Sequence, residues 1–594
     1  MLSCNPGRQV PTRARTHDPE RNRRQNQLSE PVHHNLGTAD HSMHAIRSIY
    51  ELTLLYCIAF LCLCRTGGAS YVSIDGDLTL GVLVPMHEYN FTSGSCSKHV
   101  MTDGVLILET IRYTLDQEVN GKGLLPGFRM GAVVLDTCES EKFSTLQAVT
   151  LVLLNKLLPT PSEADATNGD FTSSQAQHHP STKHLADIVN SKLRIVDPSD
   201  NNNNEGGKRA IVGVVGPMTS AASIRVANIL SSFGMPQVSY GATTESLSRS
   251  SLYPYFFRTV PSDRYQIECL VQIIRHFDWN FVIVLYEESK YGRSGFNRFR
   301  RLAHASGICF ADARILDPIT YTNESLSAML TEMDSYSKAR VVVLIATWNT
   351  VHPLFRNVKR KGLSNRFVWV GTDGWGSRLV PKDVEDVAAG SLTTHPVYRS
   401  MPDFERYFLG LLDPASGPLD EFATLKSTLQ RENPWFESFL TQNQIAHNDA
   451  FQFRETYKLL TEFGFAHFTR NAVLVYAYAV RDMHATYCKI ADSAVRVDGI
   501  CAQMWTALQQ PNALIPFIEQ AKFETEDENR FEFYNEKSGE PLYSIMNFKR
   551  YPDGAMSWIE VGQISTNNPI GHITVTANNP IEANNAIGYY SLSE

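Results

Sequence analysis

The chain has 594 residues, of which 43% are hydrophobic and 20% are charged, so it is long enough for two or more globular domains with full cores. Its formal net charge of -8 at pH 7 argues against nucleic acid as a partner, because such binding normally requires a basic face.

The N-terminal part of the chain predicts secretion. Residues 43–70 contain the short apolar run Leu52–Cys64, with Arg47 before it and small residues after it, which is typical of a signal peptide. The run is shorter than the ~20 apolar residues that cross a bilayer, and the alternative is an uncleaved anchoring helix. We expect residues 1–42 to be disordered or an artefact of the gene model.

Strand-like apolar runs alternate with helical patterns from about Leu78 onward. Apolar strands separated by helices predict parallel sheets that are covered on both faces. Their number exceeds one compact sheet, so we expect two α/β lobes. The predicted strands are Leu78–Val84, Arg129–Asp136, Ile211–Val215, Phe281–Tyr286, Val341–Ala346 and Phe367–Val370. The predicted helices are Gly104–Val119, Glu141–Leu157, Ser220–Phe233, Arg264–Phe277, Ser294–Ala305, Ser325–Tyr336 and Val351–Lys361.

Three segments look irregular. Pro159–Lys208 is polar and predicts a long surface loop, and Leu412–Asp449 is a second insert. The Asn-rich tail, residues 563–594, is expected to be disordered. Histidines in the first loop could bind a metal, but no cysteine or carboxylate accompanies them at ligand spacing, so we predict no metal site and no cofactor; they are His178, His179 and His184.

Hydroxyl side chains follow two predicted strands in the segment 211–264. Ser220 comes after Ile211–Val215 and a Gly-Pro turn, at the start of an amphipathic helix, and Thr243 follows the next short strand. A helix N-terminus beside a hydroxyl suits a carboxylate. The alternative is that Ser220 only caps its helix.

Two acidic residues and a tyrosine stand at further strand exits. Asp263 opens a predicted helix, Tyr291 follows Phe281–Tyr286, and Asp373 follows Phe367–Val370. Two carboxylates and an aromatic ring suit an ammonium group, and ligands of open α/β sheets bind beyond the carboxyl ends of strands. Each residue alone is better explained as a cap, a turn or a packing residue. Together with the two hydroxyls they predict a site for an α-amino acid between two lobes.

Several stretches resemble the extracellular ligand-binding (Venus flytrap) domain of metabotropic glutamate receptors, which are class C G-protein-coupled receptors. They read GPMTSAASIRVANIL, PQVSYGATTESLS, YPYFFRTVPSD, SKYGRSG, KARVVVL, VGTDGW and NPWFESF. The resemblance implies a bilobed clamshell of the periplasmic-binding-protein type I. Lobe 1 would comprise residues 71–258 and about 400–530, and lobe 2 residues 259–399 and about 531–562.

The resemblance also implies roles for individual residues. Ser220 and Thr243 would contact the ligand carboxylate, and Asp263, Tyr291 and Asp373 its amino group. Around the ligand side chain, Arg378 retains a family cation. Two other family cations are replaced, and one aromatic becomes acidic, so we expect an α-amino acid other than glutamate; a neutral or aromatic side chain is one option. These distal-pocket positions are Ile107, Trp505 and Glu139.

The cysteines follow the same comparison. The resemblance implies disulfides Cys96–Cys138 and Cys488–Cys501, a free Cys309 and a core Cys269. The first insert lacks the cysteine that links dimers covalently in the family, so any homodimer would be non-covalent and formed through lobe 1. Two glycosylation sequons begin at Asn90 and Asn323.

We therefore predict a receptor ligand-binding region on the outer face of the plasma membrane, or a secreted one, that closes on an α-amino acid. Coupling to a G protein would need a membrane domain beyond this chain. The alternatives are a ligand-less structural or dimerisation ectodomain and a secreted binding protein. No nucleophile–base pair or phosphate loop is visible in the sequence, so an enzyme is not predicted.

Overall fold

The computed structural model describes residues 71–90, 93–157, 210–376, 380–410, 433–442, 465–489, 499–526, 529–550, 554–565 and 572–575. The predicted signal peptide, the segment before it, the first insert, most of the second insert and Arg378 lie outside these ranges. None of the helices within them is both long and apolar enough to span a membrane.

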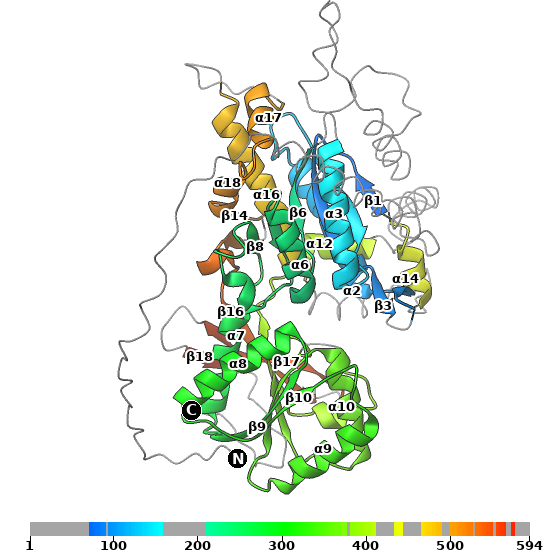
Figure 1. Cartoon of the computed structure of the whole chain (residues 1–594), viewed down its shortest axis with the longest axis vertical. Helices are drawn as coiled ribbons and strands as arrows, with labels where there is room; N and C mark the ends of the chain where they lie inside the picture. The colour runs from blue at the N-terminus through cyan, green and yellow to red at the C-terminus, as the bar shows by residue number, and fades with distance from the viewer. Residues whose placement is uncertain are drawn as a thin grey trace, which may run out of the picture. The chain divides into compact units, whose positions relative to one another are not determined.

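The first sheet has six strands in the order β1-β5-β2-β6-β7-β8. Strands β1, β6 and β8 of this sheet are labelled in Figure 1. Only β1 runs antiparallel to its neighbour. Every residue of β2 and β5 is buried, as expected for apolar strands covered on both faces. The strands are β1 Tyr71–Ile74, β2 Leu78–Val84, β5 Met130–Asp136, β6 Ala210–Val215, β7 Gln237–Ser239 and β8 Phe256–Arg258.

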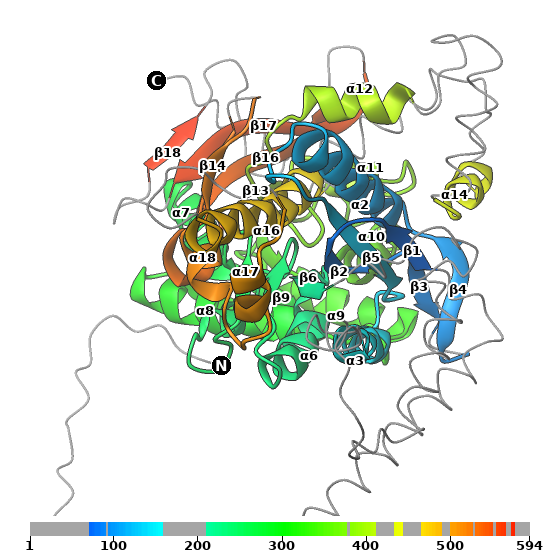
Figure 2. The same cartoon turned by 90° about the horizontal axis from the view of Figure 1, so that it is seen from above.

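Helices cover both faces of this sheet (Figure 2). Alternate strand residues contact different helices, because their side chains point to opposite faces. Leu80 and Val82 pack in one core with helices α2 and α16, whereas Leu83 packs in a second core with helices α3 and α6. The helices are α2 Thr102–Tyr113 with its π-helical continuation η2 Thr114–Asn120, α3 Glu141–Leu157, α6 Ser220–Ser231 and α16 Ala466–Tyr487. Smaller elements beside them are α12 Pro402–Gly410, α14 Phe436–Gln442, α17 Ala502–Leu508, α18 Ile515–Glu519, and the ribbons β3 His87–Asn90 with β4 Ser95–Val100 and β14 Lys522–Glu524 with β15 Arg530–Glu532.

The second sheet has eight strands in the order β10-β9-β11-β12-β13-β16-β17-β18, of which the first five are parallel. Helices α7 and α8 share a core with Val282 and Val284, and α9 and α10 share another with Ile283 and Leu285. The strands are β9 Phe281–Glu287, β10 Cys309–Leu316, β11 Val341–Ile345, β12 Val368–Gly371, β13 Leu392–Pro396, β16 Leu542–Arg550, β17 Met556–Ser565 and β18 His572–Val575. The helices are α7 Asp263–His276, α8 Lys290–Ala305, α9 Asn323–Ser335, α10 Trp348–Arg360 and α11 Glu385–Ala388.

The predicted α/β architecture, with two parallel-rich sheets flanked by helices, is confirmed. The expectation of a disordered tail from residue 563 is wrong where β17 continues to Ser565 and β18 pairs with it. Buried Ile564 gives this pairing an apolar anchor that the Asn-rich composition concealed.

Three connecting segments pass between the two sheets and contact each other. The first follows β8, the second follows β13, and the third lies between β15 and β16. Gly539 in the third segment donates its N–H to Val260 O in the first (3.2 Å). A Cβ at Gly539 would lie 1.8 Å from Thr259 O, so only glycine permits this approach.

Two disulfides, Cys96–Cys138 and Cys488–Cys501, join the pairs that the family resemblance implied. Cys269 is a buried thiol on α7. The prediction of a free Cys309 is wrong: this residue is disulfide-bonded, to a partner outside the described residues. It begins β10, an edge strand, and is half-buried, so a second thiol can reach it.

Candidate functional site

Ser220 and Thr243 lie at the carboxyl ends of neighbouring strands of the first sheet and are 9% and 5% exposed. Helix α6 begins at Ser220, and Thr219 occupies the N-cap position, so the prediction that Ser220 itself caps the helix is wrong by one residue. The Ser220 Oγ instead accepts a hydrogen bond from the Thr244 N–H (3.2 Å). This bond holds the two strand exits together.

The N-terminus of α6 is suited to an anion. Thr219 makes no side-chain capping hydrogen bond, so the first N–H groups of the helix have no partner within it. The neighbouring loop is rigid, because the Ser239 Oγ donates to Pro217 O (2.8 Å) and accepts from the Ala242 N–H (3.0 Å). Helix N–H groups and two nearby hydroxyls together can bind a carboxylate.

Asp263 faces this loop from the other side. It is the first residue of α7, and its N–H donates to Thr243 O (2.8 Å). Its side chain is 3% exposed, and neither carboxylate oxygen has a partner within hydrogen-bond distance in the part of the chain that the structure describes, although the Thr243 side chain is close enough to offset part of the effect of burial. A buried carboxylate without a donor is unfavourable in itself, so it marks a place where a ligand donor would be stabilising.

Tyr291 and Asp373 come from the second sheet. Tyr291 is the second residue of α8, and Asp373 lies in the turn after β12. The Tyr291 hydroxyl donates to Asp373 Oδ1 (3.0 Å), and both side chains are half-buried. The bond orients one carboxylate oxygen and leaves the other oxygen of Asp373 for a second donor.

The electrostatics of the site favour a positively charged ligand group. Burial, followed by the nearby charge of Asp373, raises the pKa of Asp263 to about 8, while the Thr243 side chain and the Arg258 charge offset part of the rise. Burial and the two carboxylates hold the pKa of Tyr291 well above its ordinary value, so its hydroxyl stays a donor at neutral pH. An ammonium group would relieve the repulsion between the two acids.

The structure brings the five predicted amino-acid contacts close together, namely Ser220, Thr243, Asp263, Tyr291 and Asp373. The described residues of the predicted distal pocket lie in separate parts of the fold. The side chain of Ile107 is 1% exposed inside the core between α2 and the first sheet, so it does not face an open pocket. Glu139 is half-buried just after β5, with a φ of 48°.

Trp505 lies on helix α17, beyond the last turn of helix α16. The 22 residues of this helix span about 33 Å at ~1.5 Å per residue. Near its first turn, Phe468 O accepts a hydrogen bond from Thr259 Oγ1 (2.8 Å). Trp505, on α17, follows the Cys488–Cys501 disulfide at the last turn. Trp505 therefore does not line the cavity beside Thr259, and its place around the ligand side chain stays a prediction.

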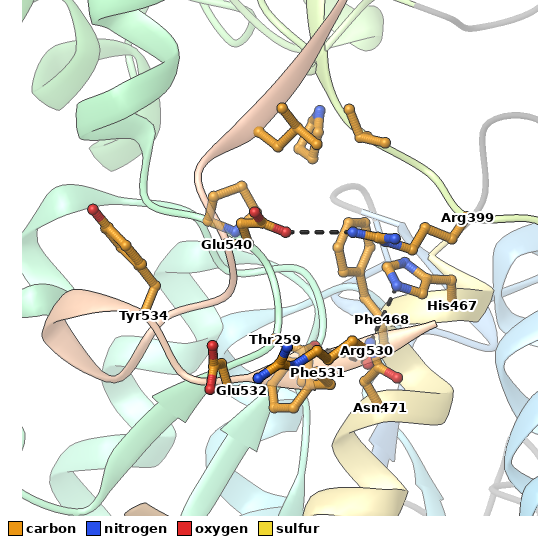
Figure 3. Close-up of a pocket in the computed structure, with 14 residues that line it drawn as sticks. Thr259, Arg399, His467, Phe468, Asn471, Arg530, Phe531, Glu532, Tyr534 and Glu540 are labelled. Carbon is orange, nitrogen blue, oxygen red and sulfur yellow. Dashed lines mark hydrogen bonds and ion pairs between the residues drawn. The ribbon is translucent and has the colours of Figure 1, made fainter. Parts of the chain in front are cut away.

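A cavity of about 400 Å³ lies where the connecting segments meet the first turn of α16 (Figure 3). Arg399 pairs with Glu540 across it (3.4 Å), and His467 bonds to Asn471 (3.1 Å). Sequence reasoning missed this cavity because its walls come from four distant stretches. It also missed Arg258, although a basic residue that ends the otherwise apolar strand β8 was a visible signal.

Among the described residues, the one cluster with metal-ligand geometry is Cys96, Asp136 and Cys138. Two of its members form a disulfide, and Asp136 accepts the N–H groups of Met86 (3.0 Å) and Cys138 (2.8 Å). A disulfide offers no thiolate, so this cluster is structural.

The sequence pattern described as "Receptor family ligand binding region" matches residues 107–550. Metabotropic glutamate receptor 6 of Oryctolagus cuniculus is 30% identical over 453 residues, which cover 74% of this chain and 47% of that receptor. Metabotropic glutamate receptor 4 of Mus musculus is 31% identical over 374 residues, covering 63% and 36%. The metabotropic glutamate receptor of Drosophila melanogaster is 28% identical over 446 residues, covering 70% and 41%. The chain spans about half the length, or less, of these relatives.

Proposed function

The chain belongs to the receptor ligand-binding regions of the metabotropic glutamate receptor type, and we propose from this premise that the site formed by these five side chains binds an α-amino acid. In this proposal the α-carboxylate is held by Ser220, Thr243 and the N–H groups of α6. The ammonium group pairs with Asp263 and Asp373, beside Tyr291.

The observation that carries the proposal is the buried carboxylate of Asp263, which has no hydrogen-bond donor in the described structure and lies between Thr243 and Asp373. A scaffold without a ligand would become more stable by replacing such a group. This argues against the alternative of a ligand-less structural ectodomain. The side chain of the preferred amino acid is left to experiment, because Ile107 is buried in the core and Trp505 lies beyond the last turn of α16.

Amino-acid binding can be tested by thermal shift of the purified full chain with each of the twenty amino acids. A ligand at 100 times its Kd adds about 2.7 kcal/mol to the free energy of unfolding. We expect Thr243→Ala to weaken binding by roughly ten- to hundred-fold, since a hydrogen bond to a charged group contributes about 1.5–3 kcal/mol.

The matched control is Thr331→Ala, an exposed threonine on α9, which should bind like the wild type. No thermal shift with any amino acid, at concentrations up to about 10 mM, would reject the proposed ligand class. An equal loss of affinity in both variants would reject the role of Thr243.

The affinity should also depend on pH. The ammonium pairs with ionised Asp263, whose pKa in the ligand-free site is raised to about 8. Below that value binding must first remove a proton, so we expect the Kd to fall by about tenfold per pH unit from roughly pH 6 to pH 8 and then to level off. Titration calorimetry in buffers of different ionisation enthalpy would show proton release at pH 7. A Kd that is flat over this range would contradict the assignment of Asp263.

For the whole protein we propose an extracellular position, a non-covalent homodimer through the first sheet and its helices, and signalling through a G protein. Support comes from the relatives named above, which are about twice as long as the matched region or longer. The exposed side chains of Asn90 and Asn323 are compatible with glycosylation. Light scattering of the secreted chain across concentrations tests the dimer.

A further inference from the structure

Arg258, the last residue of β8, holds the loop that carries Thr243. The guanidinium is 1% exposed. Its Nη1 donates to Ala242 O (3.1 Å) and to Thr244 O (2.9 Å), so it is hydrogen-bonded to the backbone on both sides of Thr243. Its Nη2 donates to the Ser248 Oγ (2.5 Å) at the end of the same loop. A planar guanidinium can hold three such acceptors at once, whereas a lysine ammonium cannot reproduce the geometry.

The same side chain contacts the third connecting segment. Its Nε donates to the Ser538 Oγ (2.9 Å), and Ser538 is fully buried. The Ser538 O in turn accepts the Tyr534 N–H (2.7 Å), which fixes the segment locally. Its neighbour Gly539 lies against the first connecting segment with no room for a Cβ. A displacement of the third segment would therefore either break the Arg258–Ser538 bond or pull on the loop 242–248.

We infer that Arg258 is a positioning residue that couples the third connecting segment to the loop 242–248 and so sets the affinity of the amino-acid site. The inference rests on the proposed function and names a residue through which that site is regulated. Arg258 does not touch the ligand. It acts through Thr243, whose carbonyl also holds the N–H of Asp263.

Arg258 has a second, electrostatic effect that can be separated from the first. The charged and titratable groups around Asp263 are Asp373, Glu245, Tyr291, Tyr543 and Arg258 itself. Of these, Arg258 is the cation, and its charge lowers the pKa of Asp263. Substitution by lysine keeps the positive charge but removes the planar set of guanidinium donors, whereas substitution by glutamine removes both.

The experiment compares amino-acid Kd values of the full chain against pH in Arg258→Lys, Arg258→Gln and Ser538→Ala. We expect Arg258→Lys to weaken binding by about tenfold or more at every pH, with the midpoint of the pH profile unchanged. Arg258→Gln should in addition move that midpoint to higher pH. Ser538→Ala keeps the hydrogen bonds from Arg258 to the loop 242–248. It should weaken binding by about threefold or more, and the midpoint of its pH profile should match that of the wild type.

The matched control is Arg366→Lys. This guanidinium also donates to backbone carbonyls, those of Tyr336 (3.0 Å) and Asp334 (3.3 Å), at the end of helix α9. It should lower the melting temperature without changing the Kd. If Arg258→Lys and Ser538→Ala lower the melting temperature but bind like the wild type, the inference is overturned and Arg258 is structural only. If the wild type binds no amino acid, the proposed function itself fails, which is a separate result. Should Arg258→Gln not fold, the other two variants decide the question.

Discussion

Replacing Asp263 by asparagine is expected to abolish amino-acid binding while making the ligand-free protein more stable at neutral and alkaline pH. The variant keeps the shape of the side chain but cannot pair with the ligand ammonium. Removing one partner of a buried charge pair costs about 2–5 kcal/mol, so the Kd should rise by roughly thirty- to several-thousand-fold. Calorimetric titration of wild type and variant measures this loss.

The effect on stability has the opposite sign. The pKa of Asp263 is raised from 3.8 to about 8 in the folded protein, chiefly by burial, so the folded state holds this proton more tightly than the unfolded state. Asp263 therefore lowers the free energy of unfolding progressively as pH rises from about 4 to 8. Asparagine does not titrate, so the variant should exceed the wild type by a margin that grows over this range and is constant above it. Urea unfolding of both proteins at several pH values measures the margin.

A second buried aspartate provides the contrast. Asp136 is 6% exposed, but its carboxylate accepts backbone N–H groups from Met86 and Cys138. Asp136→Asn should therefore destabilise the protein, because one of the two accepting oxygens is replaced by an NH₂ group, which can only donate hydrogen bonds. If Asp263→Asn were also less stable than the wild type at pH 9, the Asp263 carboxylate would have a partner in the ligand-free protein and our assignment would be wrong.

The second large effect is expected at the ion pair between Glu118 and Arg470. Arg470 Nε lies 2.9 Å from Glu118 Oε2, and Nη2 lies 2.8 Å from Oε1, with side chains only 5% and 8% exposed. The pair joins η2 to α16 within the core of the first sheet. Arg470→Met leaves the Glu118 carboxylate buried without its cation, so the free energy of unfolding should fall by about 3–5 kcal/mol. Equilibrium unfolding in urea measures this.

Two controls make the result specific to the buried pair. The double variant Glu118→Leu/Arg470→Met removes both charges and should recover most of the loss, because apolar replacements avoid desolvation. Arg481→Met removes the partner of Asp482 from the same helix, where the side chains are 35% and 44% exposed, and should change stability by less than about 1 kcal/mol. Equal losses for Arg470→Met and Arg481→Met would show that burial does not decide the contribution.

The two charged sites serve different purposes in the same fold, one in stability and one in ligand binding. The Glu118–Arg470 pair is fully matched and supports the packing of α16. Asp263 is unmatched in the ligand-free site, and its unfavourable burial is what a ligand ammonium would offset. Asp263 thus contributes to ligand binding at a cost in stability, whereas the Glu118–Arg470 pair contributes to the stability of the fold.

The amino-acid sequence by itself determined the α/β class, and it named the residues that we propose for the amino-acid site. Buried strands such as β2 and β5 are continuous apolar runs, and this local pattern is visible without any contact being known. The five proposed contacts could be found because each lies a few residues after a strand, and parallel strands end at one edge of a sheet; they are Ser220, Thr243, Asp263, Tyr291 and Asp373.

Only the tertiary structure decided which distant residues meet. The core burial of Ile107 and the position of Trp505 beyond the last turn of α16 could not be read from the sequence, because linear spacing does not reveal which end or side of a helix faces a given neighbour. The partners of Arg258 come from the loop 242–248 and from Ser538, and no local pattern links stretches that far apart. The raised pKa of Asp263 is likewise a property of the assembled site, since burial and the nearby charge of Asp373 arise only when the two sheets are brought together.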